Sequence, residues 1–300
     1  MSAAASSGAE KPTRVRELLA SASEWLAAQG IPDARLDTEL LLAHVLGIER
    51  LGLYLDHDRP LTVPERDRFR TLMRRRGAEK EPVAYLVGRR GFHGIELEVG
   101  PGCLIPRPET EHLVELALEE LAARARPGLR VVDVGTGSGC IALAVAAAAP
   151  TARVVGVDRS SAALGWALRN ARSIAPADLA SGRVAFVRGD LLGPLRPGSV
   201  DLVLSNPPYI TPDEVPALSL DVIRHEPREA LIDREGLPLT AALARAARTA
   251  LAPGGLVAVE TGAGRAELVE RHLLAAGFVE PRRVKDLSDI ERIVAARVPG

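Results

Sequence analysis

The sequence contains only two cysteines, Cys103 and Cys140, and no Cys-x-x-Cys pair. Its six histidines are scattered, without His-Glu-x-x-His spacing, so we expect neither a disulfide framework nor a bound metal. Aromatic residues make up only 3% of the 300 residues, whereas 47% are hydrophobic. A sizeable core can therefore form, but it must be built mostly from Leu, Val, Ala and Ile.

The chain also lacks a large net charge and long apolar runs. Its net charge is −1, which argues against a protein that works by covering phosphate backbones. Apolar stretches such as residues 141–149 are far shorter than the roughly 20 residues needed to span a bilayer. No basic start leads into an apolar run, so no signal peptide is indicated. These absences predict a cytoplasmic protein, expected to be monomeric, without membrane or direct nucleic-acid partners.

Apolar periodicity divides the chain into four parts. Residues 1–12 are small and polar and predict a disordered tail, whereas residues 13–82 show the three- and four-residue spacing of helices. Glycines break residues 83–107 into short extended pieces, which indicates a β-hairpin linker. Residues 108–300 alternate strands and helices, which is typical of a parallel sheet covered on both faces. The predicted fold class is therefore α/β, with a small helical N-terminal domain.

Arginines are frequent in the third helical segment of the N-terminal part. Two interpretations stay open: a solvated helix face, or a docking surface for an acidic or RNA-associated partner. The residues are Arg66, Arg68, Arg70, Arg74, Arg75 and Arg76.

A glycine-rich turn follows the first strand of the alternating region. Residues 131–134 form an apolar strand, and Gly135-Thr136-Gly137-Ser138-Gly139 then opens a helix. Glycines let a backbone turn sharply and approach a ligand closely. Asp158, at the end of the next strand, is placed to accept hydrogen bonds from both hydroxyls of a ribose.

Nicotinamide enzymes use the same order of strand, glycine turn, helix and acid, so this order alone is ambiguous. Two details favour S-adenosylmethionine. The spacing is Gly-x-Gly-x-Gly rather than Gly-x-Gly-x-x-Gly, which breaks the pyrophosphate fingerprint. Asp133, just before the turn, would repel a pyrophosphate but suits the sulfonium and amino group of the methyl donor.

Asp190 ends the third strand, where its side chain is placed to meet the adenine amine, with Leu191 against the ring. A helix cap or turn role for Asp190 is an equally open interpretation.

The chemistry is expected at Asn206-Pro207-Pro208-Tyr209, which follows a buried strand. The prolines lack N–H groups, so this edge presents acceptors. The Asn206 side-chain oxygen and the Pro207 carbonyl could hold both N–H bonds of an –NH2 group, with Tyr209 packed over its plane. An amide nitrogen is a poor nucleophile, so aiming it at the methyl group is the main task of the site. We assign the catalytic role to Asn206, Pro207 and Tyr209.

Asn-Pro-Pro-Tyr after Asp-x-Gly-x-Gly-x-Gly resembles the class I methyltransferases that modify exocyclic or amide nitrogens. Outside this core, the chain is similar to the glutamine methyltransferases of peptide chain release factors, the PrmC/HemK family. The resemblance covers nearly the whole chain beyond the first ten or so residues. The matching segments are residues 81–88, 104–111, 226–231 and 285–292.

The resemblance implies a Rossmann-like class I methyltransferase sheet and a helical N-terminal domain that helps to recognise the release factor. It also implies methylation of the glutamine in the Gly-Gly-Gln loop of that factor, with S-adenosylmethionine as methyl donor and S-adenosylhomocysteine as product. By motif position, Gly135 to Gly139, Asp158, Leu191 and Asn206 contact the cofactor. Asn206, Pro207, Pro208 and Tyr209 hold the glutamine. The family often has an aromatic residue where this chain has Leu191.

Two other acceptors stay open. A sister enzyme that methylates a glutamine of a ribosomal protein shares Asn-Pro-Pro-Tyr, although the segment at residues 105–111 resembles the release-factor branch. Methylation of an adenine amine in nucleic acid uses a similar pocket, but such enzymes usually add a recognition domain or a basic groove. The broken glycine fingerprint disfavours a nicotinamide oxidoreductase. A regulator that binds the cofactor without catalysis is also disfavoured, because it would not need the acceptor pocket.

Overall fold

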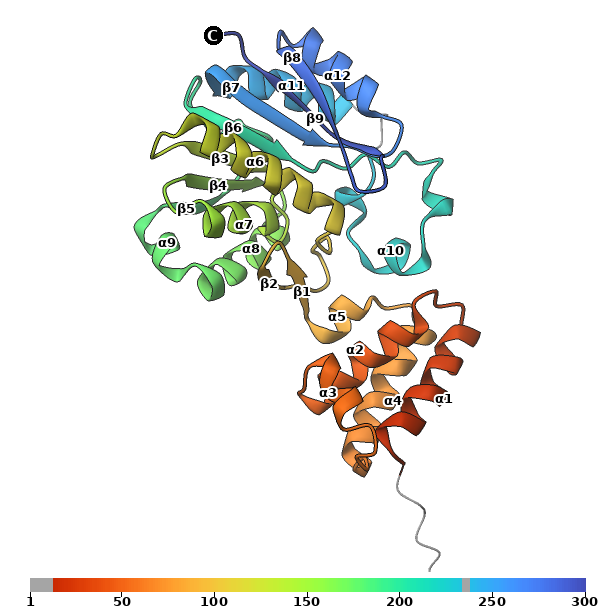
Figure 1. The fold of residues 1–300 in the computed structure, drawn as a ribbon. Helices are drawn as coiled ribbons and strands as arrows, with labels where there is room; N and C mark the ends of the chain where they lie inside the picture. The colour runs from red at the N-terminus through yellow and green to blue at the C-terminus, as the bar shows by residue number, and fades with distance from the viewer. Residues whose placement is uncertain (1–12, 234–237) are drawn as a thin grey trace, which may run out of the picture. The chain divides into compact units, whose positions relative to one another are not determined.

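The computed structural model describes residues 13–233 and 238–300. The chain divides into two compact units, Met1–Val87 and Gly88–Gly300, each with its own core (Figure 1). The tail predicted at residues 1–12 lies outside the described residues.

The first unit is helical. Thr62 starts its longest helix with a capping box: the Glu65 N–H donates to Thr62 Oγ1, and the Glu65 carboxylate accepts from the Thr62 N–H. Gly47 ends another helix in the left-handed conformation that glycine adopts without strain. The helices are α1 (Val15–Ala28), α2 (Ala34–Leu46), α3 (Arg50–Leu55), α4 (Val63–Gly77) and α5 (Val83–Val87).

The arginines of α4 fall into different environments. Arg76 is buried and donates to Asp37 on α2 at 2.6 Å. Arg75 makes two hydrogen bonds to the Glu81 carboxylate, at 2.8 and 2.6 Å. The guanidinium groups of both residues are therefore used for hydrogen bonds within the first unit. Arg66, Arg70 and Arg74 instead border a groove whose floor is apolar; it is lined by Leu18, Ala22, Trp25, Phe69 and Met73.

The second unit begins with a two-stranded antiparallel hairpin, β1 (Arg89–Phe92) and β2 (Ile95–Glu98). The alternating part that follows contains these strands: β3 (Arg130–Val134), β4 (Arg153–Asp158), β5 (Val184–Arg188), β6 (Val200–Ser205), β7 (Leu251–Glu260), β8 (Val279–Lys285) and β9 (Glu291–Arg297). Its helices are η1 (Pro108–Thr110), α6 (Glu111–Arg124), α7 (Cys140–Ala148), α8 (Ser161–Ile174), α9 (Pro176–Ser181), η2 (Val215–Ala217), α10 (Leu220–His225), η3 (Arg228–Ala230), α11 (Pro238–Ala250) and α12 (Ala266–Ala275).

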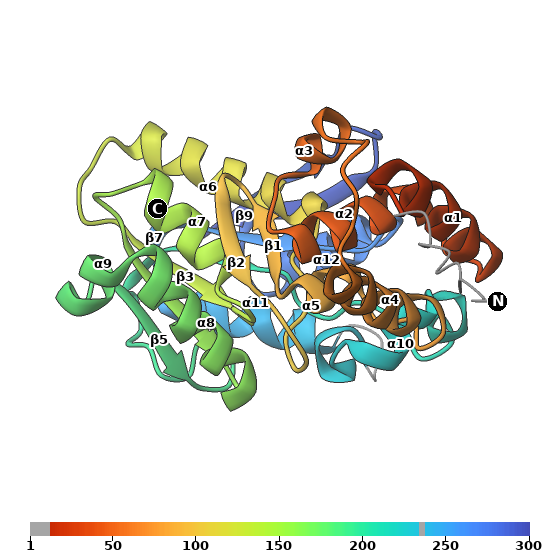
Figure 2. The same ribbon diagram turned by 90° about the horizontal axis from the view of Figure 1, so that it is seen from below.

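The seven strands form one sheet in the order β5-β4-β3-β6-β7-β9-β8. The strands from β5 to β7 in this order pair in parallel, whereas β9 pairs antiparallel with β7, and β8 pairs antiparallel with β9. The short helix α9 lies beside β5 at the other side (Figures 1 and 2). The chain runs outward from β3 to β5 and then returns to β6, so the strand order reverses between β3 and β6. Open α/β sheets bind ligands at the carboxyl ends of the strands beside such a reversal.

Alternation along β3 distributes its side chains between the two helical layers. Val132 and Val134 pack into the core cluster that includes Leu243 of α11 and Val269 of α12. Asp133 points to the opposite face, where it accepts a hydrogen bond from the Ala142 N–H of α7. Helices therefore cover both faces of the sheet, as the sequence predicts.

The predicted α/β class, a Rossmann-like sheet with an N-terminal helical part, is confirmed. The structure places residues 83–87 in helix α5 of the first unit and the β1–β2 hairpin in the second unit. The functional division into residues 13–82, 83–107 and 108–300 stays a prediction. Among the described helices, none has the length and apolarity required to cross a membrane. Within the same residues, no three His, Cys, Asp or Glu side chains gather as metal ligands.

Glu120 ties α6 to the carboxyl end of β9. Its buried carboxylate accepts two hydrogen bonds from Arg297, both at 2.7 Å, and one from Arg124 at 2.6 Å. The two guanidinium groups, Arg297 first, lower the pKa of Glu120 to about 2. The folded state therefore holds the ionised form more strongly than the unfolded chain does.

We expect Glu120→Gln to lower the free energy of unfolding of the second unit by about 2 kcal/mol at pH 7. The loss is moderated because Arg297 is partly exposed. Since the pKa of Glu120 is depressed, the stabilisation is complete above its ordinary value and disappears as pH falls towards 2. Urea unfolding followed by Trp166 fluorescence in a Trp25→Phe background measures this unit. The neighbouring exposed Glu119→Gln is the control, and equal losses in both variants would contradict the assignment.

Candidate active site

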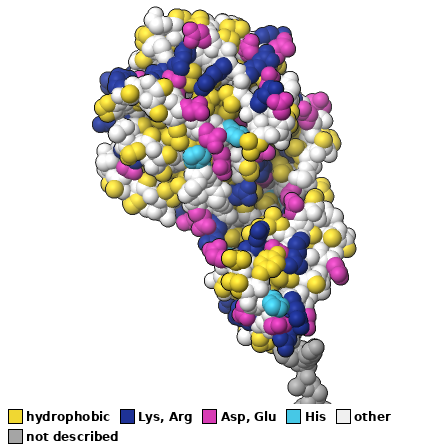
Figure 3. All heavy atoms as spheres, viewed as in Figure 1, with side chains coloured by type: hydrophobic (Ala, Val, Ile, Leu, Met, Phe, Trp, Pro, Cys, Tyr) yellow, Lys and Arg dark blue, Asp and Glu magenta, His cyan; other side chains and the backbone are white. Residues whose placement is uncertain are grey.

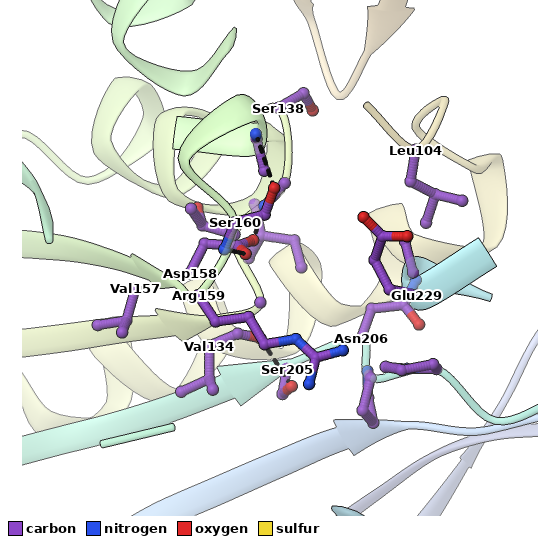
Figure 4. Close-up of a pocket in the computed structure, with 18 of the residues that line it drawn as sticks. Leu104, Val134, Ser138, Val157, Asp158, Arg159, Ser160, Ser205, Asn206 and Glu229 are labelled. Atoms are coloured by element: carbon purple, nitrogen blue, oxygen red, sulfur yellow. Dashed lines mark hydrogen bonds between the residues drawn. The ribbon is translucent and has the colours of Figure 1, made fainter. Parts of the chain in front are cut away.

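A cavity opens at the carboxyl ends of β3, β4 and β6, beside the reversal of strand order. Figure 4 shows Asp158 and Arg159 on one side of this cavity, with Asn206 and Glu229 on the other. Most of the predicted site residues lie on its wall. These are Gly135, Thr136, Gly137, Ser138, Asp158, Asp190, Leu191, Asn206, Pro207 and Pro208.

The glycines of the turn have two different roles. Gly135 and Gly137 adopt positive φ angles of 74° and 56°, and a Cβ on Gly135 would meet no atom within 4 Å. The space above this part of the turn is thus open to a ligand. A Cβ on Gly139 would instead come within 3.3 Å of Ala167, Leu143 and Phe186. Gly139 therefore packs closely against these side chains, and it does not line the cavity.

Asp133 lies beneath the turn rather than on the cavity wall. It is fully buried, and its Oδ2 accepts from Thr136 Oγ1 at 2.6 Å and from the Ala142 N–H at 3.2 Å. Burial raises the pKa of Asp133 to about 7. Within the described residues its Oδ1 has no hydrogen-bond partner. The observed role of Asp133 is to hold the turn and the start of α7, and a contact with the cofactor stays a prediction.

Asp158 ends β4 and faces the cavity (Figure 4). Its Oδ2 accepts from the Gly137 N–H at 3.0 Å, and its Oδ1 accepts from the Ser160 N–H at 2.8 Å. A carboxylate has about four lone-pair positions, so two remain for a ligand. The backbone bonds fix the orientation of the carboxylate, and its contact with ribose hydroxyls stays a prediction.

Asp190 and Leu191 lie on the wall after β5. The Gly193 N–H donates to the Asp190 carbonyl in a turn, and Asp190 caps no helix there. Leu191 has a φ of 48°, in the left-handed region that β-carbon-bearing residues avoid. Such strain persists where surrounding structure enforces it, often at ligand sites. Both residues therefore line the cavity, Leu191 also packs against the core, and their contact with an adenine stays a prediction.

Asn206 and Pro207 supply the acceptors at the end of β6. The Asn206 Nδ2 group donates to Thr110 Oγ1 at 3.0 Å. In the part of the chain that the structure describes, no donor is bound to Asn206 Oδ1 or to the Pro207 carbonyl. Ser205, just before them, is fixed by its own hydrogen bond to the Val134 carbonyl at 2.8 Å. The strand end is therefore rigid and has acceptors available.

Tyr209 is not on the cavity wall. Its carbonyl accepts from Arg265 at 2.6 Å, and a Cβ on Gly262 would come within 3.0 Å of its ring. Burial, and then the nearby Glu260, raise the pKa of the phenol, so it is held in the neutral form. Its predicted packing over a substrate amide stays a prediction.

Several residues that the sequence did not single out organise the site. Glu226 is buried and joins two distant segments: its carboxylate accepts from the Ile105 N–H at 3.0 Å and from Arg107 at 2.6 Å. Asn170 of α8 bonds both backbone groups of Glu98 and the Ser138 carbonyl, which fixes β2 against the glycine turn. Ile105 and Glu226 lie in two segments that resemble the family, residues 104–111 and 226–231. The sequence does not show that they pair, because only the fold brings them together.

Comparisons with known proteins identify the family of this chain. The family model described as PrmC N-terminal domain matches residues 17–88, and the model described as Methyltransferase small domain matches residues 112–236. A solved structure titled as a release factor-specific protein-(glutamine-N5) methyltransferase, from Alicyclobacillus acidocaldarius, is 35% identical. It covers 68% of this chain and 99% of its own, with a TM-score of 0.40.

Curated relatives extend over nearly the whole length. A protein of Geobacter sulfurreducens named release factor glutamine methyltransferase is 40% identical over 292 residues, which is 96% of this chain and 99% of the relative. A protein of the same name from Burkholderia pseudomallei is 43% identical over 283 residues, covering 94% and 97%. Identity of this extent, over both units of the chain, establishes that this protein belongs to the family of release factor glutamine methyltransferases.

Proposed function

We propose that this chain transfers a methyl group from S-adenosylmethionine to the side-chain amide nitrogen of the glutamine in the Gly-Gly-Gln motif of peptide chain release factors. One observation carries the proposal. The acceptors of Asn206 and Pro207 lie on the wall of the same cavity as the open glycine turn and Asp158. Family membership supports the choice of acceptor.

The residues of the cavity fit the methyl donor. Gly135 and Gly137 leave open space above the turn, where side chains would exclude a ligand. Asp158 keeps two lone-pair positions, which we assign to the ribose hydroxyls. Asp190 and Leu191 line the same cavity, and we assign them to the adenine. When bound, the cofactor supplies an electrophilic methyl group on a cationic sulfur. The residues of this chain hold it and aim the acceptor.

At the acceptor end, the task is orientation. An amide nitrogen is a weak nucleophile because its lone pair is delocalised into the carbonyl group. Asn206 Oδ1 and the Pro207 carbonyl each accept one N–H of the glutamine amide, which fixes the direction of the nitrogen. They also stabilise the positive charge that develops on the nitrogen during transfer. The proton is lost after the N–C bond forms, so no strong base has to act beforehand.

The surface of the second unit is consistent with a protein acceptor. On the face shown in Figure 3, acidic and basic side chains are interspersed over this unit instead of forming one basic stripe. A nucleic-acid methyltransferase is expected to present a strongly positive groove. In the first unit, the groove bordered by Arg66, Arg70 and Arg74 has the mixed apolar and basic character suited to a protein surface. We propose that this unit helps to recognise the release factor.

A side-by-side assay tests the proposal. The purified protein receives labelled S-adenosylmethionine together with release factor, ribosomal protein or nucleic acid. We expect label in the release factor, and its loss when the acceptor glutamine is replaced by alanine. Label in ribosomal protein or nucleic acid, but not in release factor, would assign the chain to one of the alternative acceptors.

A further inference from the structure

Residues 206–233, which follow β6, contribute to the cavity wall at both of their ends, and we call them the insert. Asn206 and Pro207 lie on the wall at the start of the insert. Near its end, Pro227 and Ala230 lie on the same wall. The insert therefore carries both the groups assigned to the substrate amide and a more distant part of the wall.

Two backbone hydrogen bonds connect the start of the insert to its end. The Ile210 N–H donates to the Leu231 carbonyl at 3.1 Å, and the Asp233 N–H donates to the Ile210 carbonyl at 3.0 Å. Movement at the end of the insert is therefore transmitted to the residues that follow Asn206 and Pro207.

Glu226 joins the insert to a second part of the wall, residues 104–110. Its side chain is only 1% exposed and does not line the cavity. The carboxylate accepts from the Ile105 N–H at 3.0 Å and from Arg107 Nη2 at 2.6 Å. The residues of this second part that line the cavity are Leu104, Pro106, Arg107 and Thr110. One buried carboxylate thus holds two parts of the wall together from behind.

The second part of the wall also contacts Asn206. The Thr110 N–H donates to the Arg107 carbonyl at 3.1 Å, and Thr110 Oγ1 accepts from Asn206 Nδ2 at 3.0 Å. Hydrogen bonds therefore lead from Glu226 through residues 105–110 to the amide that we assign to the reaction.

The cofactor side of the cavity is held by other groups. Asp158 accepts from the Gly137 N–H at 3.0 Å and from the Ser160 N–H at 2.8 Å. These three residues belong to neither of the parts that Glu226 joins. A change at Glu226 should therefore displace the acceptor side of the wall more than the cofactor side.

We propose that Glu226 is a positioning residue for methyl transfer, because it keeps residues 105–107 and the insert in the geometry that orients the substrate amide. A charge-assisted hydrogen bond to a guanidinium group is roughly twice as strong as a neutral one, which suits this task. The inference rests on the proposed function for the identity of the acceptor. The joining of the two parts of the wall does not depend on which acceptor is methylated.

Glu226→Gln tests the carboxylate with little change in size. Glutamine has one oxygen acceptor, and its NH2 group opposes one of the two donors. We expect kcat/KM for release factor to fall roughly 10- to 100-fold, since a displacement of about 1 Å far from the reacting atoms can cost that much. The affinity for S-adenosylhomocysteine should change little. Wild-type kcat/KM in this variant would overturn the proposal.

Asp201→Asn is a matched control. Asp201 is also buried, and it accepts from the Arg130 N–H at 2.9 Å and from Arg126 at 2.6 Å. It lies near the amino end of β6, whereas the cavity opens at the carboxyl ends of the strands. Its variant should lose stability in urea to a similar degree and keep the wild-type kcat/KM. Equal losses of kcat/KM in both variants would show that Glu226 acts only through stability, which would overturn the proposal.

A double variant tests whether Glu226 and Arg107 act through their bond. Arg107→Gln alone leaves the buried carboxylate without its cation, which is costly. Adding Glu226→Gln removes that charge, so the double variant should lose no more kcat/KM than Arg107→Gln does. Losses that multiply would show that the two residues act independently, against the proposal.

Hydrogen exchange tests the same joint without a substrate. In Glu226→Gln, the amides of Ile105 and Thr110 should exchange faster than in the wild type, whereas those of residues 135–139 should be unchanged. Unchanged exchange at Ile105 and Thr110 would overturn the proposal.

The two kinds of measurement separate the inference from the proposed function. If exchange accelerates as described but the wild type does not methylate release factor, the joint stands and the proposed acceptor is wrong. If release factor is methylated but neither exchange nor kcat/KM responds to Glu226→Gln, the acceptor stands and the role of Glu226 is wrong.

Discussion

Asn206→Ala should reduce methyl transfer to release factor by roughly 10²- to 10³-fold, the size of effect seen when one hydrogen-bonding group aimed at the reacting atoms is removed. The substitution deletes the Oδ1 acceptor and leaves the Thr110 hydroxyl without its donor. Because Asp158 and the glycine turn are untouched, we expect cofactor affinity to fall by no more than a few-fold. Single-turnover transfer of labelled methyl, with the affinity for S-adenosylhomocysteine from calorimetry, measures both quantities.

Thr249→Ala is a matched control, since it also truncates a polar side chain of the second unit but at an exposed position of α11. It should transfer methyl groups at the wild-type rate. Turnover close to normal in Asn206→Ala would show that the acceptor pocket is assigned to the wrong residues. A loss of cofactor affinity as large as the loss of transfer would show that Asn206 acts mainly by binding the cofactor.

Asp158→Ala should weaken the binding of S-adenosylhomocysteine by roughly 10- to 100-fold, since hydrogen bonds to a charged group contribute about 1.5–3 kcal/mol. Asp158 also holds the Gly137 and Ser160 N–H groups, so part of any loss could come from a displaced turn. A 2′-deoxyribose analogue of the ligand separates the two effects. If Asp158 binds the ribose, the wild type prefers the ribose ligand and the variant loses that preference.

Equal weakening of both ligands in Asp158→Ala would show that the carboxylate only supports the turn. Asp289→Ala is the control, because Asp289 is exposed and its ion pair with Lys285 lies at the surface. It should bind both ligands as the wild type does. The comparison needs no methyl acceptor, so it tests the cofactor site independently of the proposed substrate.

The local chemistry of this protein could be read from the sequence because its determinants are neighbours along the chain. The glycine turn needs only residues 131–139, and the acceptor edge needs only a buried strand that ends in two prolines. Both lie at carboxyl ends of parallel strands, so the alternating pattern was sufficient to place them at one edge of the sheet. Asp158 and Asn206 meet at one cavity for this reason.

The tertiary structure decided which of the predicted residues line the cavity and which support it from outside. The sequence suggested Asp133 as a direct partner of the cofactor, and that contact stays a prediction. The alternation of side chains along β3 decides that Asp133 lies beneath the glycine turn, fully buried and bonded to Thr136. Tyr209 does not line the cavity, and its carbonyl accepts a hydrogen bond from Arg265. Spacing along the chain does not reveal which face of a strand a helix will cover, nor which arginine reaches a loop.

The sequence alone thus determined the fold class, the edge of the sheet that carries the site, and the groups able to hold a cofactor and an amide. It could not determine how Asn206 is oriented. That depends on Thr110, which lies 96 residues before Asn206 in the sequence and accepts a hydrogen bond from its Nδ2 group. The direction of a hydrogen bond depends on which groups are neighbours in space, and only the tertiary structure brings Thr110 of η1 beside the end of β6.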